Sequence, residues 1–310
     1  MTVKIGYLLA TRENIMRGVH GTDSLLRLAR HAADLGFESL WAGDSLFARP
    51  RHDPITLLAG VAAAVPDVQI GTAVLLPMLR NPVVLAQQLA TVDQLSDGRL
   101  IIGAGIAADT PAIRNEFEAA GVPFEKRVGR LLEGFQLMRA LWAGEPVEWN
   151  GRWTVNAQAA LAPTPVQPGG PPVWLAAGVK PGITRAAKHF DGWFPIGPDA
   201  ETFGKRNVYY RDCVEKEGTG PGTTAIYLTV CLDDDGDAAE AAIDTYLKAY
   251  YGAPPDIMRR VMACIGGPAE TVMAAMKDYV DAGAEHLVLR LVGDHDAALA
   301  TLARHRHLLG

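Results

Sequence analysis

The segment Ala177-Gly178-Val179-Lys180-Pro181-Gly182 has the composition of an anion-binding loop. Glycine lets backbone amides come close to a ligand, and the start of a following helix attracts negative charge. Lys180 adds a cation at the same place. We therefore interpret this loop as a phosphate site. The alternative is an ordinary turn between a strand and a helix.

Asp44 closes the segment Trp41-Ala42-Gly43-Asp44, which we expect to end a strand. In a barrel the carboxyl ends of the strands carry the chemistry, so this carboxylate is expected to transfer a proton or orient a ligand. Capping of a loop or helix is the alternative. His20 and His52 are loop histidines that could transfer a proton instead, with an ordinary surface role as the alternative.

Other common chemistries lack their sequence signals. None of the serines lies in a GxSxG context, and HExxH and Walker A patterns are missing. We therefore expect no metal site. Gly103-Ala104-Gly105 has the form of a dinucleotide-binding motif, but a long loop follows it instead of a helix. We expect Gly103 and Gly105 to let the backbone approach a flat ligand.

Composition narrows the class of protein further. The 310 residues carry a net charge of −6, which argues against binding of duplex nucleic acid. We find no apolar stretch of the roughly 18 residues that a membrane span needs, and no signal peptide at the N-terminus. The three cysteines form no CxxC pair and suit a reducing compartment. The expectation is a cytoplasmic protein that binds neither nucleic acid nor a membrane.

The elements that must position these residues follow an alternating pattern. Apolar runs predict strands, and helical periodicity separates them, which indicates a (β/α)8 TIM barrel in a single domain over residues 1–310. A linker in the Pro/Gly-rich run at 163–172 is the alternative. We expect a hairpin around Asn150-Gly151, and insertions after strand 4 (Gly105–Pro123) and between strands 7 and 8 (Ala253–Gly267). The predicted strands are Val3–Leu9, Glu38–Ala42, Val68–Leu75, Arg99–Gly103, Val173–Ala176, Gly192–Ile196, Thr224–Leu232 and His286–Val292.

Several segments, in this order, resemble the bacterial-luciferase-like monooxygenases. They are GFESLWAGDSL, the run from Ile70 to Gly105, AAKHFDGWFPIG, and GGPAETV with DAGAEHLVLRL. The resemblance extends from Val3 to Val292 and implies a barrel that holds a flavin or deazaflavin ring at its mouth. Such a cofactor carries the difficult chemistry, and the protein positions it.

The resemblance also implies roles for particular residues. Thr72, Ala73 and Val74, with Gly103 and Gly105, would support the ring, with a non-prolyl cis peptide bond at Ala73–Val74; a plain buried strand is the alternative. The phosphate of the cofactor would lie on the loop from Ala177 to Pro181. Tyr7 would line the substrate pocket, with buried packing as the alternative. Many relatives carry His where this chain has Ser45, so the group that transfers a proton stays open.

For function, the resemblance implies an oxidoreductase that acts on a small organic substrate. The first hypothesis is a monooxygenase that uses O2 and reduced FMN. A separate flavin reductase would supply the reduced FMN. The alternative is hydride transfer with coenzyme F420, whose acidic tail would suit the cations of Arg49, Arg51, Arg80 and Lys180. A barrel lyase or isomerase and a non-catalytic flavin-binding protein are more remote alternatives. A homodimer is expected, because dimers are common in the family.

Overall fold

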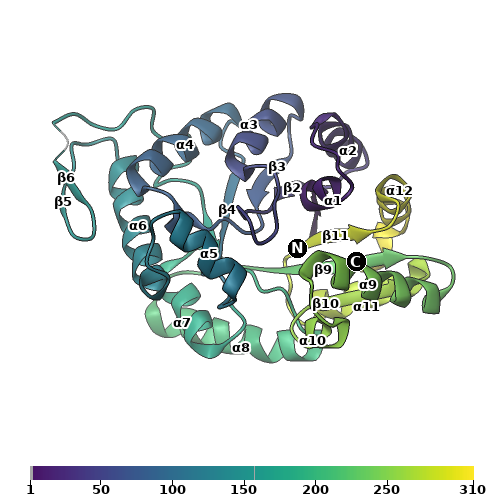
Figure 1. The fold of residues 1–310 in the computed structure, drawn as a ribbon. Helices are drawn as coiled ribbons and strands as arrows, with labels where there is room; N and C mark the ends of the chain where they lie inside the picture. Colours follow the sequence, from purple (N-terminus) through teal and green to yellow (C-terminus); the bar gives the residue numbers. More distant parts are fainter. Residues whose placement is uncertain (1–2, 157) are drawn as a thin grey trace. The chain divides into compact units, whose positions relative to one another are not determined.

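The computed structural model describes residues 3–156 and 158–310 (Figure 1). Strands and helices alternate along the chain. The strands are β1 (Lys4–Leu8), β2 (Ser39–Ala42), β3 (Gln69–Thr72), β4 (Leu100–Ala104), β5 (Glu148–Asn150), β6 (Thr154–Asn156), β7 (Val173–Leu175), β8 (Gly192–Trp193), β9 (Thr223–Leu232), β10 (Ala263–Gly267) and β11 (His286–Val292). The helices are α1 (Thr11–Met16), α2 (Asp23–Asp34), α3 (Pro54–Ala64), α4 (Pro82–Leu95), α5 (Pro111–Ala119), α6 (Arg127–Trp142), α7 (Lys180–His189), α8 (Ala200–Glu217), α9 (Gly236–Tyr251), α10 (Pro255–Arg259), α11 (Ala269–Asp281) and α12 (His295–His305).

The chain divides into two compact units, which are described separately. Unit 1 comprises residues 1–41 and 174–310. Its parallel strands follow in the order β7-β8-β9-β11-β1-β2, and β10 pairs with β9 beyond the end of β8. One face of this sheet buries Trp41, Trp174, Phe194 and His286 against one another. We call it the inner face, because side chains from successive strands fill the interior of a barrel in this way.

Unit 2 comprises residues 42–173. Strand β3 runs parallel to β4, and the bridge between Leu75 and Ala104 continues that pairing. The antiparallel strands β5 and β6 form the hairpin predicted around Asn150-Gly151, which projects from the rest of the unit (Figure 1). Helices α3, α4 and α6 pack in sequence beside the strands.

The architecture is the predicted (β/α)8 barrel, in which β1, β2, β3, β4, β7, β8, β9 and β11 are the barrel strands. Each of them overlaps one of the strands expected from the apolar runs. The insertion after strand 4 is not a bare loop, because Pro111–Ala119 forms α5, whose first turn Thr110 caps by accepting a hydrogen bond from Ile113 N.

The insertion between strands 7 and 8 is larger than the sequence indicated. Ala263–Gly267, expected to belong to a loop, forms strand β10 in register with Leu228–Leu232 of β9. Helix α11, which packs against α8 and α12, takes the place of the outer helix after strand 7. Helix α9 instead packs on β10, where a side chain at Gly266 would meet Ala239 and Ile243. The insertion between strands 7 and 8 therefore includes α9, α10 and β10.

Capping residues define several of the helix ends. Asp53 accepts from Thr56 N at the start of α3, and Asn81 accepts from Val83 N at the start of α4. Gly36 has a φ of 85° just after α2, as expected for a terminating glycine. At the start of α2, the side chain of Thr22 makes no capping hydrogen bond.

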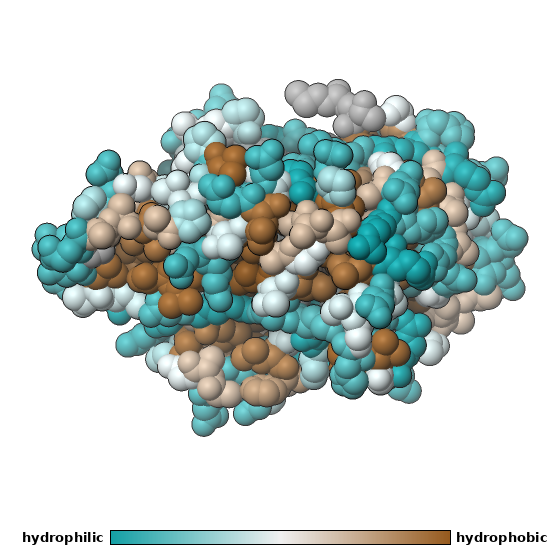
Figure 2. Space-filling view, turned by 90° about the horizontal axis from the view of Figure 1, so that it is seen from above, coloured by the Kyte–Doolittle hydropathy of each residue, from teal (hydrophilic) through white to brown (hydrophobic). Residues whose placement is uncertain are grey.

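The surface mixes polar and apolar residues. On the face shown in Figure 2, brown apolar patches lie among teal hydrophilic ones. Exposed large apolar side chains include Phe47, Val179 and Ile257. Within the described residues, we find no helix whose length and hydropathy would let it cross a membrane.

Candidate active site

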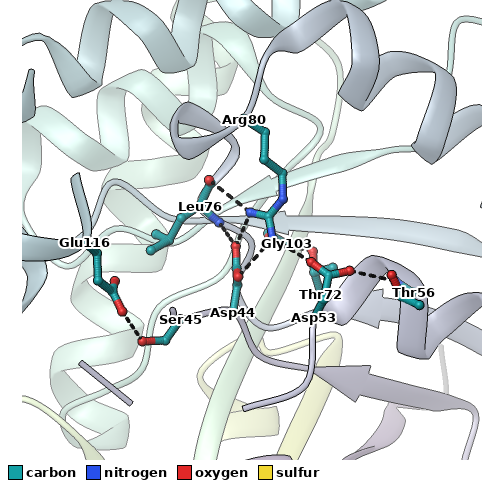
Figure 3. A network of polar contacts seen from close by, with 9 residues as sticks. All are labelled: Asp44, Ser45, Asp53, Thr56, Thr72, Leu76, Arg80, Gly103 and Glu116. Atoms are coloured by element: carbon teal, nitrogen blue, oxygen red, sulfur yellow. Dashed lines mark hydrogen bonds and ion pairs between the residues drawn. The ribbon is translucent and has the colours of Figure 1, made fainter. Parts of the chain in front are cut away.

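Asp44 lies at the centre of a polar network in unit 2 (Figure 3). Its side chain is only 3% exposed and forms a two-pronged ion pair with Arg80, at 2.6 Å and 3.1 Å. The backbone amide of Leu76 donates to the same carboxylate at 3.0 Å. Arg80 also donates to Asp53 at 2.8 Å, which links this network to the start of α3. Both oxygens of Asp44 are thus engaged.

The network shifts the pKa values of Arg80 and Asp53. Burial acts to lower the pKa of Arg80, but its bonds to Asp44 and Asp53 outweigh burial and raise that pKa. Burial likewise acts to raise the pKa of Asp53, yet hydrogen bonds from Thr56 and Arg80 leave that pKa lowered. Both oxygens of the Asp44 carboxylate already accept hydrogen bonds from Arg80, and one of them also accepts from the amide of Leu76. The geometry therefore favours the orienting role of Asp44 over proton transfer.

Ser45 is buried and holds a loop beside this network. Its hydroxyl donates to Glu116 Oε1 at 2.6 Å and accepts from the amide of Arg49. The amides of Phe47 and Ala48 donate to the same Glu116 oxygen. Ser45 therefore fixes the course of the 45–49 loop.

The segment expected to support a ring lies at the end of β3. The Ala73–Val74 peptide bond is cis, at the position that the family resemblance indicated. Thr72 is buried and donates to the carbonyl of Gly103 at 2.8 Å, whereas Ala73 and Val74 are half-buried. Only the residues at the cis bond thus present partly accessible surface on this segment.

Gly103 near the end of β4 and Gly105 just after it are both buried. The carbonyl of Gly103 accepts hydrogen bonds from Thr72 and from the amide of Leu75. A β-carbon at Gly105 would lie 2.5 Å from Val74 Cγ2, so the absence of a side chain there makes room for Val74. That these glycines let the backbone approach a flat ligand stays a prediction.

The anion-binding loop lies in unit 1, between β7 and α7. Gly178, Val179 and Lys180 are exposed, and Lys180 is the first residue of the ten-residue helix α7. A β-carbon at Gly178 would meet only Arg206 Nη1, at 3.7 Å. The carbonyl of Ala177 accepts from Trp193, and Pro181 has no amide hydrogen to offer. An open backbone beside two cations fits a phosphate, with Lys180 and Arg206 as its partners.

Tyr7 lies on the other face of β1 from the inner face. It is fully buried, and its hydroxyl is 2.8 Å from Nδ1 of His295 in α12. This position favours the packing alternative over a place in the substrate pocket. His20 is exposed and His52 is half-buried, so proton transfer by either remains a prediction.

Within residues 3–156 and 158–310, no three His, Cys, Asp or Glu side chains come together in an arrangement that could hold a metal ion.

Comparison with known proteins decides the family. The luciferase-like monooxygenase family matches residues 3–286. The chain belongs to this family. It is accordingly a luciferase-like oxidoreductase with the barrel fold.

Similar proteins include F420-dependent dehydrogenases and a monooxygenase. The F420-dependent glucose-6-phosphate dehydrogenase of Kineococcus radiotolerans is 30% identical over 336 residues, covering 96% of this chain and 94% of that protein. The F420-dependent hydroxymycolic acid dehydrogenase of Mycobacterium tuberculosis is 29% identical and covers 84% and 74%, respectively. The structure of the monooxygenase RslO1 from Streptomyces bottropensis has a TM-score of 0.82 at 26% identity and covers 97% and 98% of the two chains.

Sequence reasoning found some members of each site and missed others. Asp44 and the Gly178–Lys180 loop were identified from strand ends and glycines. Arg80 was expected to hold an acidic tail, but its guanidinium is occupied by carboxylates. Glu116 and Arg206 were missed, because each lies on a helix distant in sequence from the loop it contacts. The helical periodicity of 111–119 was the only signal that pointed toward Glu116.

Proposed function

We propose that this luciferase-like protein is an F420-dependent oxidoreductase that transfers a hydride between the cofactor and a small organic substrate. The observation that carries the proposal is the likeness to F420-dependent dehydrogenases along nearly the full length of the chain. This reverses the order of the two hypotheses from the sequence, which placed FMN first. F420, when bound, supplies two-electron hydride chemistry.

The chain's own residues supply binding and orientation. The amide end of α7, Lys180 and Arg206 would hold the phosphate of the cofactor. The half-buried Ala73–Val74 peptide would support the ring. Asp44, fixed by Arg80, would orient a ligand as a rigid, charged acceptor.

Monooxygenation with reduced FMN is the second candidate. The structural likeness to RslO1, which covers nearly all of both chains, is the observation that favours it. In that case a separate flavin reductase would supply the reduced cofactor. A homodimer is proposed for either candidate, from the family resemblance alone.

Binding titrations with F420, FMN and reduced FMN distinguish the candidates, followed by oxygen-uptake and anaerobic hydride-transfer assays. We expect F420 to bind more tightly than FMN. We also expect at least one compound from a small panel of alcohols and sugar phosphates to reduce or oxidise the bound F420 without consumption of oxygen. Tight binding of reduced FMN with oxygen uptake, and no binding of F420, would establish the second candidate instead.

The phosphate site has its own test. Lys180→Ala should weaken F420 binding roughly tenfold, equivalent to about 1.4 kcal/mol. Lys205→Ala is the matched control, because Lys205 is an exposed lysine of unit 1 that pairs with Glu201 on α8. Equal affinities for the two variants would remove Lys180 from the proposed site.

A further inference from the structure

Arg290 on β11 is a buried cation that the proposed cofactor site does not use. It is 1% exposed and pairs in register with Thr229 of β9. Alternate residues of a strand share a face, so Arg290 lies on the same inner face as His286. It stands two residues before the carboxyl end of β11, the end of a barrel strand at which ligands are bound.

The contacts of Arg290 are uncharged. Nη1 donates to the hydroxyl of Tyr251 and Nη2 to the hydroxyl of Thr229, both at 2.7 Å. Nη2 also lies 4.0 Å from the sulfur of Met262, a weak acceptor. The guanidinium carbon lies 4.9 to 5.4 Å from aromatic ring centres, which are those of Tyr227, Tyr246, Tyr250 and Tyr251.

The charge of Arg290 has no counter-charge in contact. Among residues 3–156 and 158–310, no carboxylate forms an ion pair with it. Burial raises the pKa of Tyr227 and of Tyr246 well above the ordinary value, so these neighbours stay neutral. The nearby carboxylate of Glu13 accepts from the hydroxyl of Tyr246, not from the guanidinium. The rings offset part of the cost of burying the charge by cation–π attraction.

Arg290 also has hydrogen-bond donors to spare. Its Nε is buried and has no acceptor, although a guanidinium carries five N–H groups. Arg99 shows how a purely structural arginine differs, since its Nε, Nη1 and Nη2 all donate to backbone carbonyls. Excess positive charge together with unfilled donors is complementary to an oxyanion.

We propose that Arg290 binds an anionic oxygen group, a carboxylate or phosphate, on the organic substrate. Helix α9 supplies Tyr246, Tyr250 and Tyr251 as the wall of this site. Tyr246 and Tyr251 are partly exposed, so we place the entry of the anion on this side. The arriving anion displaces the Tyr251 hydroxyl from Nη1. That the anion is a substrate rests on the proposed function, whereas the anion site itself does not.

Nitrogen-15 NMR of arginine side chains in the full-length protein tests the site directly. Sodium formate and sodium phosphate are titrated at constant ionic strength, in a Lys180→Ala background that weakens the loop before α7. The Nε–H resonance of Arg290, assigned by its loss in Arg290→Lys, should shift saturably with a midpoint on the order of 1–10 mM for at least one salt. The Nε–H resonance of Arg99 is the internal control and should not move.

Tyr251→Phe provides a second measurement that does not depend on the folding of an Arg290 variant. Removal of the hydroxyl frees Nη1, so the midpoint should fall by roughly threefold or more. An Arg290 resonance that stays unmoved by both salts, or that moves only in parallel with Arg99, would overturn the inference. A protein that binds formate at Arg290 but ignores F420 would instead overturn the proposed function alone.

Discussion

At the scale of single residues, the molecule depends on a few buried polar groups that are held by their neighbours. Asp44 is a buried carboxylate in a two-pronged ion pair with Arg80. His286 is a histidine kept neutral by an apolar surrounding, since its only polar side-chain partner in the described contacts is the hydroxyl of Ser39. These two arrangements respond to substitution and to pH in ways that can be measured.

Removal of Arg80 should strongly destabilise unit 2. Arg80→Met leaves Asp44 buried without its partner, which typically costs about 3–5 kcal/mol. Arg114→Met is the control, because the ion pairs of Arg114 with Asp109 and Glu125 are exposed to solvent and contribute little to stability. Urea unfolding measures both variants. Similar losses for the two would show that the Asp44–Arg80 pair has no special role in stability.

Acid should weaken the fold through His286. Burial lowers the pKa of His286 to about 3, from an ordinary value of 6.5. The unfolded chain therefore takes up a proton below pH 6.5 that the folded chain excludes, and stability falls as the pH falls. Between pH 7 and 5 this one group should remove about 2 kcal/mol. Unfolding free energies of wild type and His286→Gln across that range test the claim, which requires a shallower pH dependence in the variant.

At the scale of elements, close packing between neighbouring strands explains residues that looked like ligand contacts. The strand end at Ala73–Val74 and the turn after β4 fit together because Gly105 leaves room for the side chain of Val74. Helix α9 likewise packs on β10 instead of taking a place in the outer ring of helices. The tyrosines of α9 contact Arg290 for this reason. In both cases the contact partner is distant in sequence.

A methyl group at Gly105 should therefore destabilise the protein. Gly105→Ala places a β-carbon against Val74, and such overpacking costs typically about 1–3 kcal/mol. The double variant Val74→Ala/Gly105→Ala removes the clash and should recover part of the loss relative to Val74→Ala alone. Chemical unfolding of the three variants gives the coupling free energy between positions 74 and 105. Additive effects would mean that Gly105 is required for another reason.

At the scale of the whole molecule, the single-domain interpretation remains a prediction. Unit 1 is discontinuous in sequence, since it joins residues 1–41 to 174–310 around unit 2. A fold that needs both ends of the chain to complete one sheet is expected to unfold as one body.

Unfolding should accordingly be a single transition. Each unit contains tryptophans, for example Trp193 in unit 1 and Trp142 in unit 2. Single-tryptophan variants that report on either unit, compared with far-UV circular dichroism, should give coincident urea midpoints. Two separated midpoints would show that the units unfold independently and that the chain has two domains.

The sequence alone determined the features that depend on local pattern. Apolar runs located the barrel strands, and Asn150-Gly151 located the hairpin, because each signal comes from neighbours in the chain. The glycines and Lys180 located the loop before α7 for the same reason. A resemblance carried by ordered segments located the cis bond at Ala73–Val74.

Only the tertiary structure decided which groups meet. Asp44 is paired with Arg80, Ser45 with Glu116, and Arg290 with tyrosines of α9, across separations of 36, 71 and about 40 residues, respectively. Strand β10 was not predicted within the insertion at Ala253–Gly267, because five residues containing two glycines carry little local strand signal. Its pairing with β9 stabilises the extended conformation. Charge and exposure at the site are set by these distant partners, which no local pattern records.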